Sequence, residues 1–128
     1  EKGRLGDVQV TVLEKSRQIM LNPFQGISEA ERNVLDPAIR EAVKRFAVLD
    51  GAFVLREDGV VLAAGRYLSS KGQDVKLPLG LGARHTAAAG ITQDTNCITV
   101  VVSQTSGSVR FFKSGHTLLE LHQTARRT

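Results

Sequence analysis

The first group suited to chemistry is the acid Asp50, which is followed by Gly51 and Ala52 at the junction of a predicted helix and a predicted strand. A carboxylate at such a junction can face a cleft and bind a hard cation such as Mg²⁺ or Mn²⁺. Gly51 has no side chain, so a flat ligand could approach the backbone there. Asp-Gly pairs are also common in plain turns, and the tripeptide alone is compatible with either interpretation.

The second group is the segment 81–86, Leu-Gly-Ala-Arg-His-Thr, at the predicted start of a helix. The free amides and the positive end of a helix favour an anion. Arg84 adds a permanent charge that matches phosphate oxygens, Thr86 adds a hydroxyl, and His85 adds a donor or a metal ligand. The segment therefore indicates phosphate binding. In the plainer alternative, Arg84 pairs with an acid and His85 is a structural residue at the helix start.

Two further places could contact a ligand. Ser103 and Gln104 close an apolar segment, and polar groups at such a strand end often face a ligand crevice in α/β sheets. They could equally start the turn that Gly107 completes. Tyr67 is the only tyrosine and is followed by Leu68. Its ring could pack on a nucleotide base or cover the core.

Capping signals predict the helix that leads to the acid. Asp36 suits the N-cap and Pro37 suits the first helical position, so a helix begins there. The spacing of its apolar residues extends it over about 37–48. Ser28 and Glu31 likewise indicate a capping box at the start of a short helix.

The other elements are predicted from hydrophobic periodicity and turn residues. Asp58-Gly59 predicts a tight hairpin turn, because glycine accepts a positive φ. A long loop is predicted over 66–82 and an alanine-rich helix over about 84–93. The predicted strands are 8–13, 52–56, 60–64, a buried strand at 98–102, and 109–112, with a last strand or helix near 117–122. This mixture predicts an α/β fold, a single domain with a central mixed β-sheet flanked by helices.

The composition limits the class of protein. The chain has 128 residues, 41% hydrophobic and 23% charged, which suits one globular domain. It has a single cysteine and no long apolar run, so nothing implies export or a membrane span and we expect a cytoplasmic protein. The net charge of +4 favours an anionic partner. Aromatic residues are only 5% with no tryptophan, which suits small anions at least as well as a nucleic-acid strand.

Taken together, these segments resemble the catalytic domain of diadenylate cyclases over roughly residues 36–113. The matching segments are, in order, Asp50-Gly51-Ala52, Tyr67-Leu68, residues 81–91 around Arg84-His85-Thr86, and Val101-Val102-Ser103-Gln104. The stretches Asn22-Pro23-Phe24 and Leu35-Asp36-Pro37 are most similar to the archaeal branch, in which an upstream domain precedes the catalytic one. We therefore expect residues 1–27 to be an N-terminal extension or linker remnant and residues 28–128 to be the catalytic domain.

The resemblance implies synthesis of the second messenger cyclic di-AMP from two ATP molecules, with release of two pyrophosphates. Asp50, with Mn²⁺ or Mg²⁺ as cofactor, would ready the attacking 3′-hydroxyl, and Arg84 and His85 complete the expected catalytic set. The expected nucleotide contacts are Gly51, Ala52, Tyr67, Leu68, Gly82, Ala83, Arg84, His85, Thr86, Ser103 and Gln104. Because the reaction joins two ATP molecules, a face-to-face homodimer is the expected active assembly, within a larger oligomer or alone.

Four positions depart from the family's pattern. Leu49 stands where some members have a metal-contacting histidine, and Gln104 where some branches have an acid. Ala83 replaces a threonine and Thr86 an arginine that are common in bacterial members. These departures support an alternative function, a catalytically inactive module that binds ATP or cyclic di-AMP. A nucleic-acid-binding module is a third interpretation, based on the net charge alone.

Overall fold

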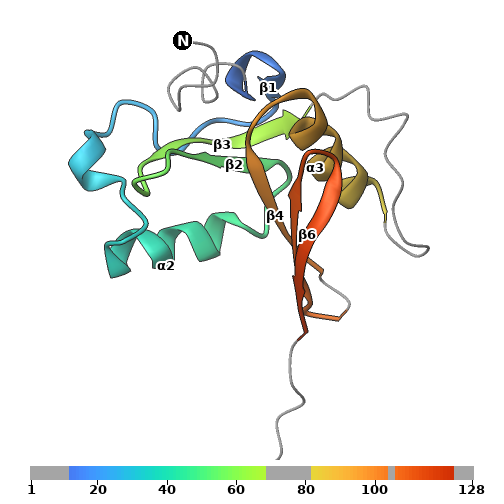
Figure 1. Ribbon diagram of the computed structural model, residues 1–128. Coiled ribbons are helices and arrows are strands. Elements are labelled where there is room, and N and C mark those ends of the chain that lie inside the picture. The colour runs from blue at the N-terminus through green and yellow to red at the C-terminus, as the bar shows by residue number, and fades with distance from the viewer. Residues whose placement is uncertain (1–11, 69–81, 104–105, 123–128) are drawn as a thin grey trace, which may run out of the picture. The chain divides into compact units, whose positions relative to one another are not determined.

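The computed structural model describes residues 12–68, 82–103 and 106–122 and divides into two compact units (Figure 1). Unit 1 lies within residues 1–68 and unit 2 within residues 69–128. Each unit is described below by itself. Among the described residues, no helix has the length and apolar character needed to cross a bilayer.

Unit 1 is built on a three-stranded antiparallel sheet. Its order is β1 (Ser16–Gln18), β3 (Val61–Leu68) and β2 (Ala52–Leu55), with β3 in the centre (Figure 1). The predicted hairpin between β2 and β3 is confirmed, and Gly59 at its turn has a φ of +98°. This sheet places the N-terminal end of β2, where the acid lies, beside the C-terminal end of β3.

The helix α2 (Pro37–Phe46) confirms the capping prediction. Asp36 Oδ1 accepts a hydrogen bond from the Ala38 amide at 2.9 Å, and Pro37 occupies the first turn. The helix α2 runs along the sheet (Figure 1), and its apolar residues Ile39, Val43 and Phe46 pack against the core of unit 1. The cluster it contacts consists of buried residues from β3 and the preceding segment: Phe24, Val61 and Ala64.

The short helix before α2 forms, but without the predicted capping box. It is a single 3-10 turn, η1 (Glu29–Glu31), and the Ser28 side chain makes no capping hydrogen bond. The Ser28 carbonyl instead accepts the Glu31 amide at 3.0 Å. A one-turn helix satisfies its amides through the backbone in this way, so the hydroxyl cap is not used.

The start of unit 1 differs from the predicted strand 8–13. Residues 12–14 form a helical turn, and residues 8–11 lie outside the described part of the chain. The turn is held from a distance, because the Arg66 guanidinium donates to the Leu13 carbonyl at 2.6 Å and to the Ser16 carbonyl at 2.7 Å. The alternation of apolar and polar residues within a short stretch of sequence gives no information about such a long-range contact.

Two segment boundaries also need comment. Residues 66–68, predicted as loop, belong to β3, because β1 pairs with them in register. The rest of that loop, residues 69–81, lies outside the described residues. The domain boundary between residues 27 and 28 stays a prediction, although β1 and the buried Phe24 precede it and are part of unit 1.

Unit 2 packs one helix on a second antiparallel sheet. The predicted helix is α3 (Ala83–Asp94). The sheet order is β4 (Ile98–Val102), β5 (Val109–Lys113) and β6 (His116–Leu121), so the last segment is a strand. The Thr99 hydroxyl donates to the Ala88 carbonyl at 3.0 Å and ties β4 to the helix. The core between them consists of Ala88, Ala89, Val101 and Phe112.

Two predictions for the sheets need correction. In β4 only Val101 is buried, whereas Ile98, Val100 and Val102 are about half exposed, because α3 covers one face of the sheet. The α/β class is confirmed, but the described strands form two three-stranded antiparallel sheets and not one mixed sheet. Short turns join β2 to β3, β4 to β5 and β5 to β6, and strands joined by short turns run antiparallel.

Candidate functional site

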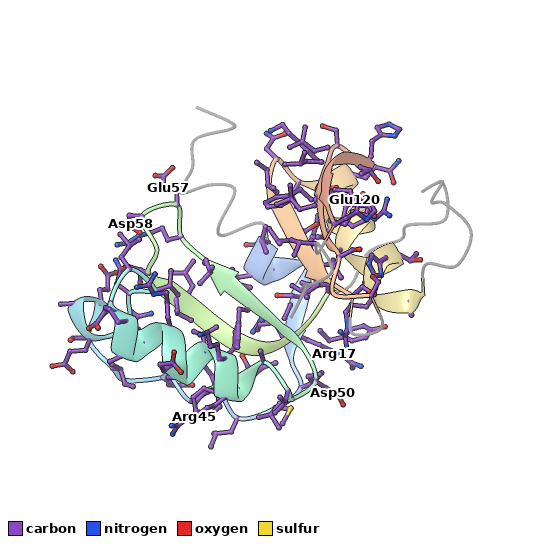
Figure 2. The ribbon with its side chains drawn as sticks, turned by 90° about the horizontal axis from the view of Figure 1, so that it is seen from below. Arg17, Arg45, Asp50, Glu57, Asp58 and Glu120 are labelled. Atoms are coloured by element: carbon purple, nitrogen blue, oxygen red, sulfur yellow. The ribbon has the colours of Figure 1, made fainter. Side chains whose placement is uncertain are left out.

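The acid Asp50 lies in the turn between α2 and β2, with its side chain exposed. Figure 2 shows it at the end of unit 1 opposite the hairpin tip that carries Glu57 and Asp58. The following residue, Gly51, has a φ of +99°, and a Cβ built on it would lie 2.7 Å from the Gly65 carbonyl carbon. Only glycine fits this contact between backbones, so the position of Asp50 is fixed by the sterics of its neighbour.

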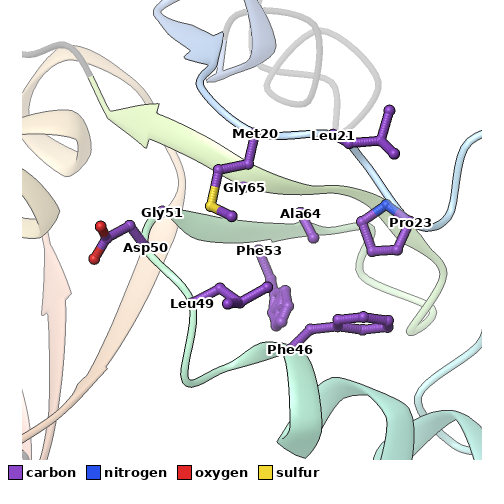
Figure 3. Close-up of a pocket in the computed structure, with 10 residues that line it drawn as sticks. All are labelled: Met20, Leu21, Pro23, Phe46, Leu49, Asp50, Gly51, Phe53, Ala64 and Gly65. Carbon is purple, nitrogen blue, oxygen red and sulfur yellow. The ribbon is translucent and has the colours of Figure 1, made fainter.

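A small hollow adjoins the acid within unit 1. It encloses about 20 Å³, enough for one or two water molecules. Apart from Asp50 and Gly51 its lining is apolar or glycine: Met20, Leu21, Pro23, Phe46, Leu49, Phe53, Ala64 and Gly65. Figure 3 shows the Asp50 carboxylate pointing away from these side chains. The acid therefore sits at an apolar rim with its charge directed outward.

Of the lining residues, only Leu49, Asp50 and Gly51 were singled out from the sequence as site or departing positions. Met20 and Pro23 follow β1, and they reach the hollow because β1 pairs with β3. Leu49, noted above as a departure from the family, lies directly beside the acid. Its apolar side chain offers no ligand to a cation.

Tyr67 and Leu68 are the last two residues of β3. The Tyr67 side chain is available to a ligand, since the residue is 50% exposed. Its cross-strand partner is Arg17, whose guanidinium carbon lies 5.2 Å from the centre of the phenol ring. Ala52 is paired with Arg66, so the acid-bearing turn and Tyr67 lie at the same end of the unit 1 sheet.

The N-terminus of α3 is open in the way that anion binding requires. Gly82 is the N-cap in extended conformation and, being glycine, supplies no capping side chain. The Thr86 amide and hydroxyl both donate to the Gly82 carbonyl, at 3.1 and 3.3 Å. The amides of Ala83, Arg84 and His85 precede the first intrahelical bond and have no acceptor among the described residues, so they could bind an external one. Arg84 is exposed beside them.

His85 is held against the sheet of unit 2. Its ring meets Phe112 edge-on, with the ring centres 6.3 Å apart. Burial lowers the pKa of His85 below its ordinary value, and the charges of Arg110 and Arg84 lower it further, against a weaker opposing effect of Glu120. The imidazole is therefore neutral at pH 7 and can donate one hydrogen bond and accept another.

An ion pair that was not predicted from the sequence lies close to this histidine. Arg110 on β5 and Glu120 on β6 are cross-strand partners, with a nitrogen–oxygen distance of 2.6 Å, and both side chains are largely buried. Because opposite charges directly across a ladder attract, the register of the two strands could have suggested the pair. Its guanidinium contributes to keeping His85 uncharged.

Ser103 forms a turn, as the plainer interpretation had it. Its amide donates to the Ser108 carbonyl at 2.8 Å, and its carbonyl accepts the Gly107 amide at 2.9 Å. The contact between Thr99 and Ala88 and the antiparallel run of α3 and β4 place Ser103 toward the same end of unit 2 as the α3 N-terminus. Gln104 lies outside the described residues.

A cation at the predicted ligand Asp50 would find few other protein ligands among the described residues. Within residues 12–68, 82–103 and 106–122, no three His, Cys, Asp or Glu side chains gather to hold a metal ion. Asp50 presents an exposed carboxylate. Mg²⁺ in nucleotide enzymes is commonly held by one or two carboxylates together with substrate phosphates and water. The donor set therefore fits a cation that arrives with phosphates better than a permanent protein-bound ion.

Comparison with known proteins identifies the relatives of this chain. The family described as DisA bacterial checkpoint controller nucleotide-binding (DAC) matches residues 4–117. The diadenylate cyclase of Methanocaldococcus jannaschii is 43% identical over 116 residues, covering 91% of this chain and 36% of that protein. The diadenylate cyclase of Haloferax volcanii is 42% identical over 114 residues, covering 89% and 41%.

A bacterial relative is more distant. The diadenylate cyclase of Listeria monocytogenes is 31% identical over 121 residues, covering 80% of this chain and 44% of that protein. The higher identity to the two archaeal proteins confirms the predicted likeness to the archaeal branch. The chain spans less than half the length of each of these relatives.

Proposed function

The chain belongs to the DAC family of nucleotide-binding domains, and we propose that it condenses two ATP molecules into cyclic di-AMP. In each half of the reaction a 3′-oxygen attacks the α-phosphorus of the other ATP, the hydroxyl loses its proton, and one pyrophosphate leaves. The observation that carries this proposal is the match over residues 4–117, which includes every predicted site residue, together with two archaeal diadenylate cyclases above 40% identity.

We assign activation of the attacking hydroxyl to Asp50. Its carboxylate is exposed at an apolar rim and directed outward, which suits a group that meets a substrate oxygen. A divalent cation, Mn²⁺ or Mg²⁺, held by Asp50 and phosphate oxygens would supply charge neutralisation and a lower hydroxyl pKa. Gly51 and Ala52 follow the acid and would line the ribose and base, because Gly51 adds no side chain to obstruct them.

We propose that the N-terminus of α3 binds the phosphates of ATP. The free amides there and the exposed Arg84 form an anion-binding end, which stabilises charge on the leaving pyrophosphate. The neutral His85 can donate a hydrogen bond without competing for a proton at pH 7. The Ser103 hydroxyl, toward the same end of unit 2, keeps its proton for a phosphate oxygen, whereas the Thr86 hydroxyl would have to turn away from the Gly82 carbonyl to donate. Gln104 follows Ser103 directly in the chain.

We propose that Tyr67 and Leu68 contact the adenine base of ATP. The Tyr67 ring is half exposed at the acid-bearing end of the unit 1 sheet, which suits stacking of a flat base.

One chain carries one such set of residues, whereas the product needs two attacks. A two-fold, face-to-face homodimer would provide both, and we propose this assembly in the cytoplasm, where ATP is available.

The function is tested by incubating the protein with ATP and either Mn²⁺ or Mg²⁺, followed by mass spectrometry of the products. We expect cyclic di-AMP and two equivalents of pyrophosphate, with a rate per chain that rises with protein concentration as dimers form. No cyclic di-AMP with either metal over a wide range of protein concentration would contradict the proposal.

One observation favours the second candidate, a module that binds ATP or cyclic di-AMP without turnover. Leu49 places an apolar side chain beside Asp50, where some family members have a metal-contacting histidine. Calorimetric titration distinguishes the two functions. Tight binding of ATP or cyclic di-AMP with no pyrophosphate release would favour the regulatory module over the enzyme.

A further inference from the structure

Arg17 lies over the ring of the one tyrosine in the chain. Arg17 and Tyr67 face each other across the β1–β3 ladder, and the guanidinium carbon is 5.2 Å from the ring centre. This distance is within the range in which a cation and an aromatic face attract each other. Within the described residues Arg17 forms no ion pair, so its charge is not already committed to a carboxylate.

The position of Arg17 is fixed on both sides along β1. On one side, Ser16 is held by Arg66, whose guanidinium donates to the Ser16 hydroxyl at 2.9 Å and to its carbonyl at 2.7 Å. On the other side, the Gln18 side-chain amide donates to the Met20 carbonyl at 2.7 Å and also to the Ala64 carbonyl. A strand of three residues would be weak alone, but these contacts hold β1 and therefore the guanidinium in place.

On the β2 side of Tyr67, the described residues carry no group comparable to Arg17. The β2–β3 ladder ends at the pair Ala52–Arg66, and the next residue on the β2 side is Gly51. Gly51 lies against the backbone of Gly65 and Arg66 and has no side chain. The ring thus has a guanidinium on its β1 side and a side-chain-free residue on its β2 side.

We propose that Arg17 is a positioning residue for the nucleotide base. It holds the Tyr67 ring by stacking its planar guanidinium on one face, so that a purine base can stack on the other face. This inference rests on the proposed function, because it concerns the base of the same nucleotide. It adds a residue from β1, outside the segments that resemble the family's motifs. Lysine is a poor substitute here, since an ammonium group has no plane to stack.

The chain provides a selective readout for this contact. Tyr67 is its only tyrosine and there is no tryptophan, so its intrinsic emission reports Tyr67 alone. The full chain is titrated with AMP and with ATP, without metal, while this emission is followed. The variants are Arg17→Ala, Arg17→Lys and Arg45→Ala, and the last is a matched control because Arg45 is exposed on α2, as Figure 2 shows.

We expect Arg17→Ala to change the emission of the free protein and to weaken AMP and ATP equally, by about two- to fivefold. Arg17→Lys should recover only part of the loss, and Arg45→Ala should match the wild type. A loss for ATP but not for AMP would overturn the inference, because Arg17 would then contact the β- or γ-phosphate and not the base. Full recovery by Arg17→Lys would overturn it as well, since charge alone would suffice.

The outcome also separates this inference from the proposed function. If the wild type forms cyclic di-AMP while Arg17→Ala binds AMP as tightly as Arg45→Ala does, the role of Arg17 is wrong and the enzyme stands. If the wild type binds neither AMP nor ATP and forms no product, both are wrong.

Discussion

The two units present their reactive groups in different ways. In unit 1, Asp50 is placed by close backbone packing, since Gly51 touches Gly65 and the neighbouring turn borders an apolar hollow. In unit 2, Arg84 stands at a helix end whose N-cap is glycine, and no side chain of the described residues caps the amides there. The position of the acid therefore depends on sterics that tolerate no added atom, whereas the proposed phosphate-binding role of the α3 N-terminus depends on amides that have no partner among the described residues.

This difference has a chemical meaning. A group that must meet one substrate oxygen gains from rigid placement, because a misplacement of about 1 Å can cost a large factor in rate. A group that neutralises phosphate charge acts over a longer range and tolerates small movements. We therefore expect backbone changes to be most harmful in unit 1 and charge changes to act mainly on affinity in unit 2.

The largest effect on stability is expected from Gly51→Ala, compared with alanine substitutions at two other glycines. Gly51→Ala adds a Cβ 2.7 Å from the Gly65 backbone at a φ of +99°, and should lower the free energy of unfolding by about 2–4 kcal/mol. Gly26→Ala has the same sign of φ without a described atom within 4 Å, so its cost should be about 1 kcal/mol.

Gly82→Ala is the control from unit 2. Its φ is −93°, and no described atom lies within 4 Å of the added carbon, so the change should stay within about 1 kcal/mol. Urea unfolding of the three variants gives the order. If Gly51→Ala and Gly82→Ala lowered the free energy of unfolding equally, the proposed difference in backbone packing between the two units would be wrong.

The next largest effect is expected on the KM for ATP, from substitution of Arg84. Arg84→Ala should raise the KM for ATP by about tenfold, because a hydrogen bond to a charged phosphate oxygen is lost. Arg84→Lys should recover part of this, since it keeps the charge but not the planar group. Arg45→Ala removes an exposed arginine from α2 and should leave KM unchanged. Steady-state kinetics would refute the phosphate role if Arg84→Ala and Arg45→Ala gave the same KM.

The smallest effect is a dependence of stability on pH. The pKa of His85 is lowered in the folded protein, so between that pKa and the ordinary value of 6.5 the unfolded chain binds more protons. The free energy of unfolding should therefore fall as the pH drops below 6.5, and the full loss is reached below the folded-state pKa. His85→Gln should flatten this slope.

His116→Gln is the control for the histidine, because His116 is exposed on β6. Urea unfolding at pH 7.5 and at pH 5.5 measures the slope for each protein. The same slope in the wild type and in His85→Gln would show that His85 is not the titrating group.

Local signals predicted the elements that local chemistry determines. The helix α2 was predictable because Asp36 and Pro37 act within its first turn, and the hairpin was predictable because Gly59 must take a positive φ. The turn at residues 12–14 was not, since Arg66 holds it from 50 or more positions away. The exposure of Val100 was not predictable either, because a continuous apolar run does not say which face a helix will cover.

The candidate site follows the same division. Gly51 could be predicted as a site residue because it follows Asp50 in the sequence. The reason that it must be glycine is its contact with the Gly65 backbone, which comes close only because β2 pairs with β3. Arg17 could not be named, because it approaches Tyr67 across a ladder between distant segments. Residues that act through side chains in one segment were thus easier to predict than those that act across the sheet.

The most direct test of the division of roles measures ATP binding and turnover in one variant, Asp50→Asn. We expect its Kd for ATP to stay within about twofold of the wild type while cyclic di-AMP formation falls by a factor of about 10²–10⁴, the usual contribution of a positioned acid–base group. Glu57→Gln, at the far end of the unit 1 sheet, should match the wild type in both. Full turnover by Asp50→Asn, or loss of ATP binding together with turnover, would contradict the role assigned to Asp50.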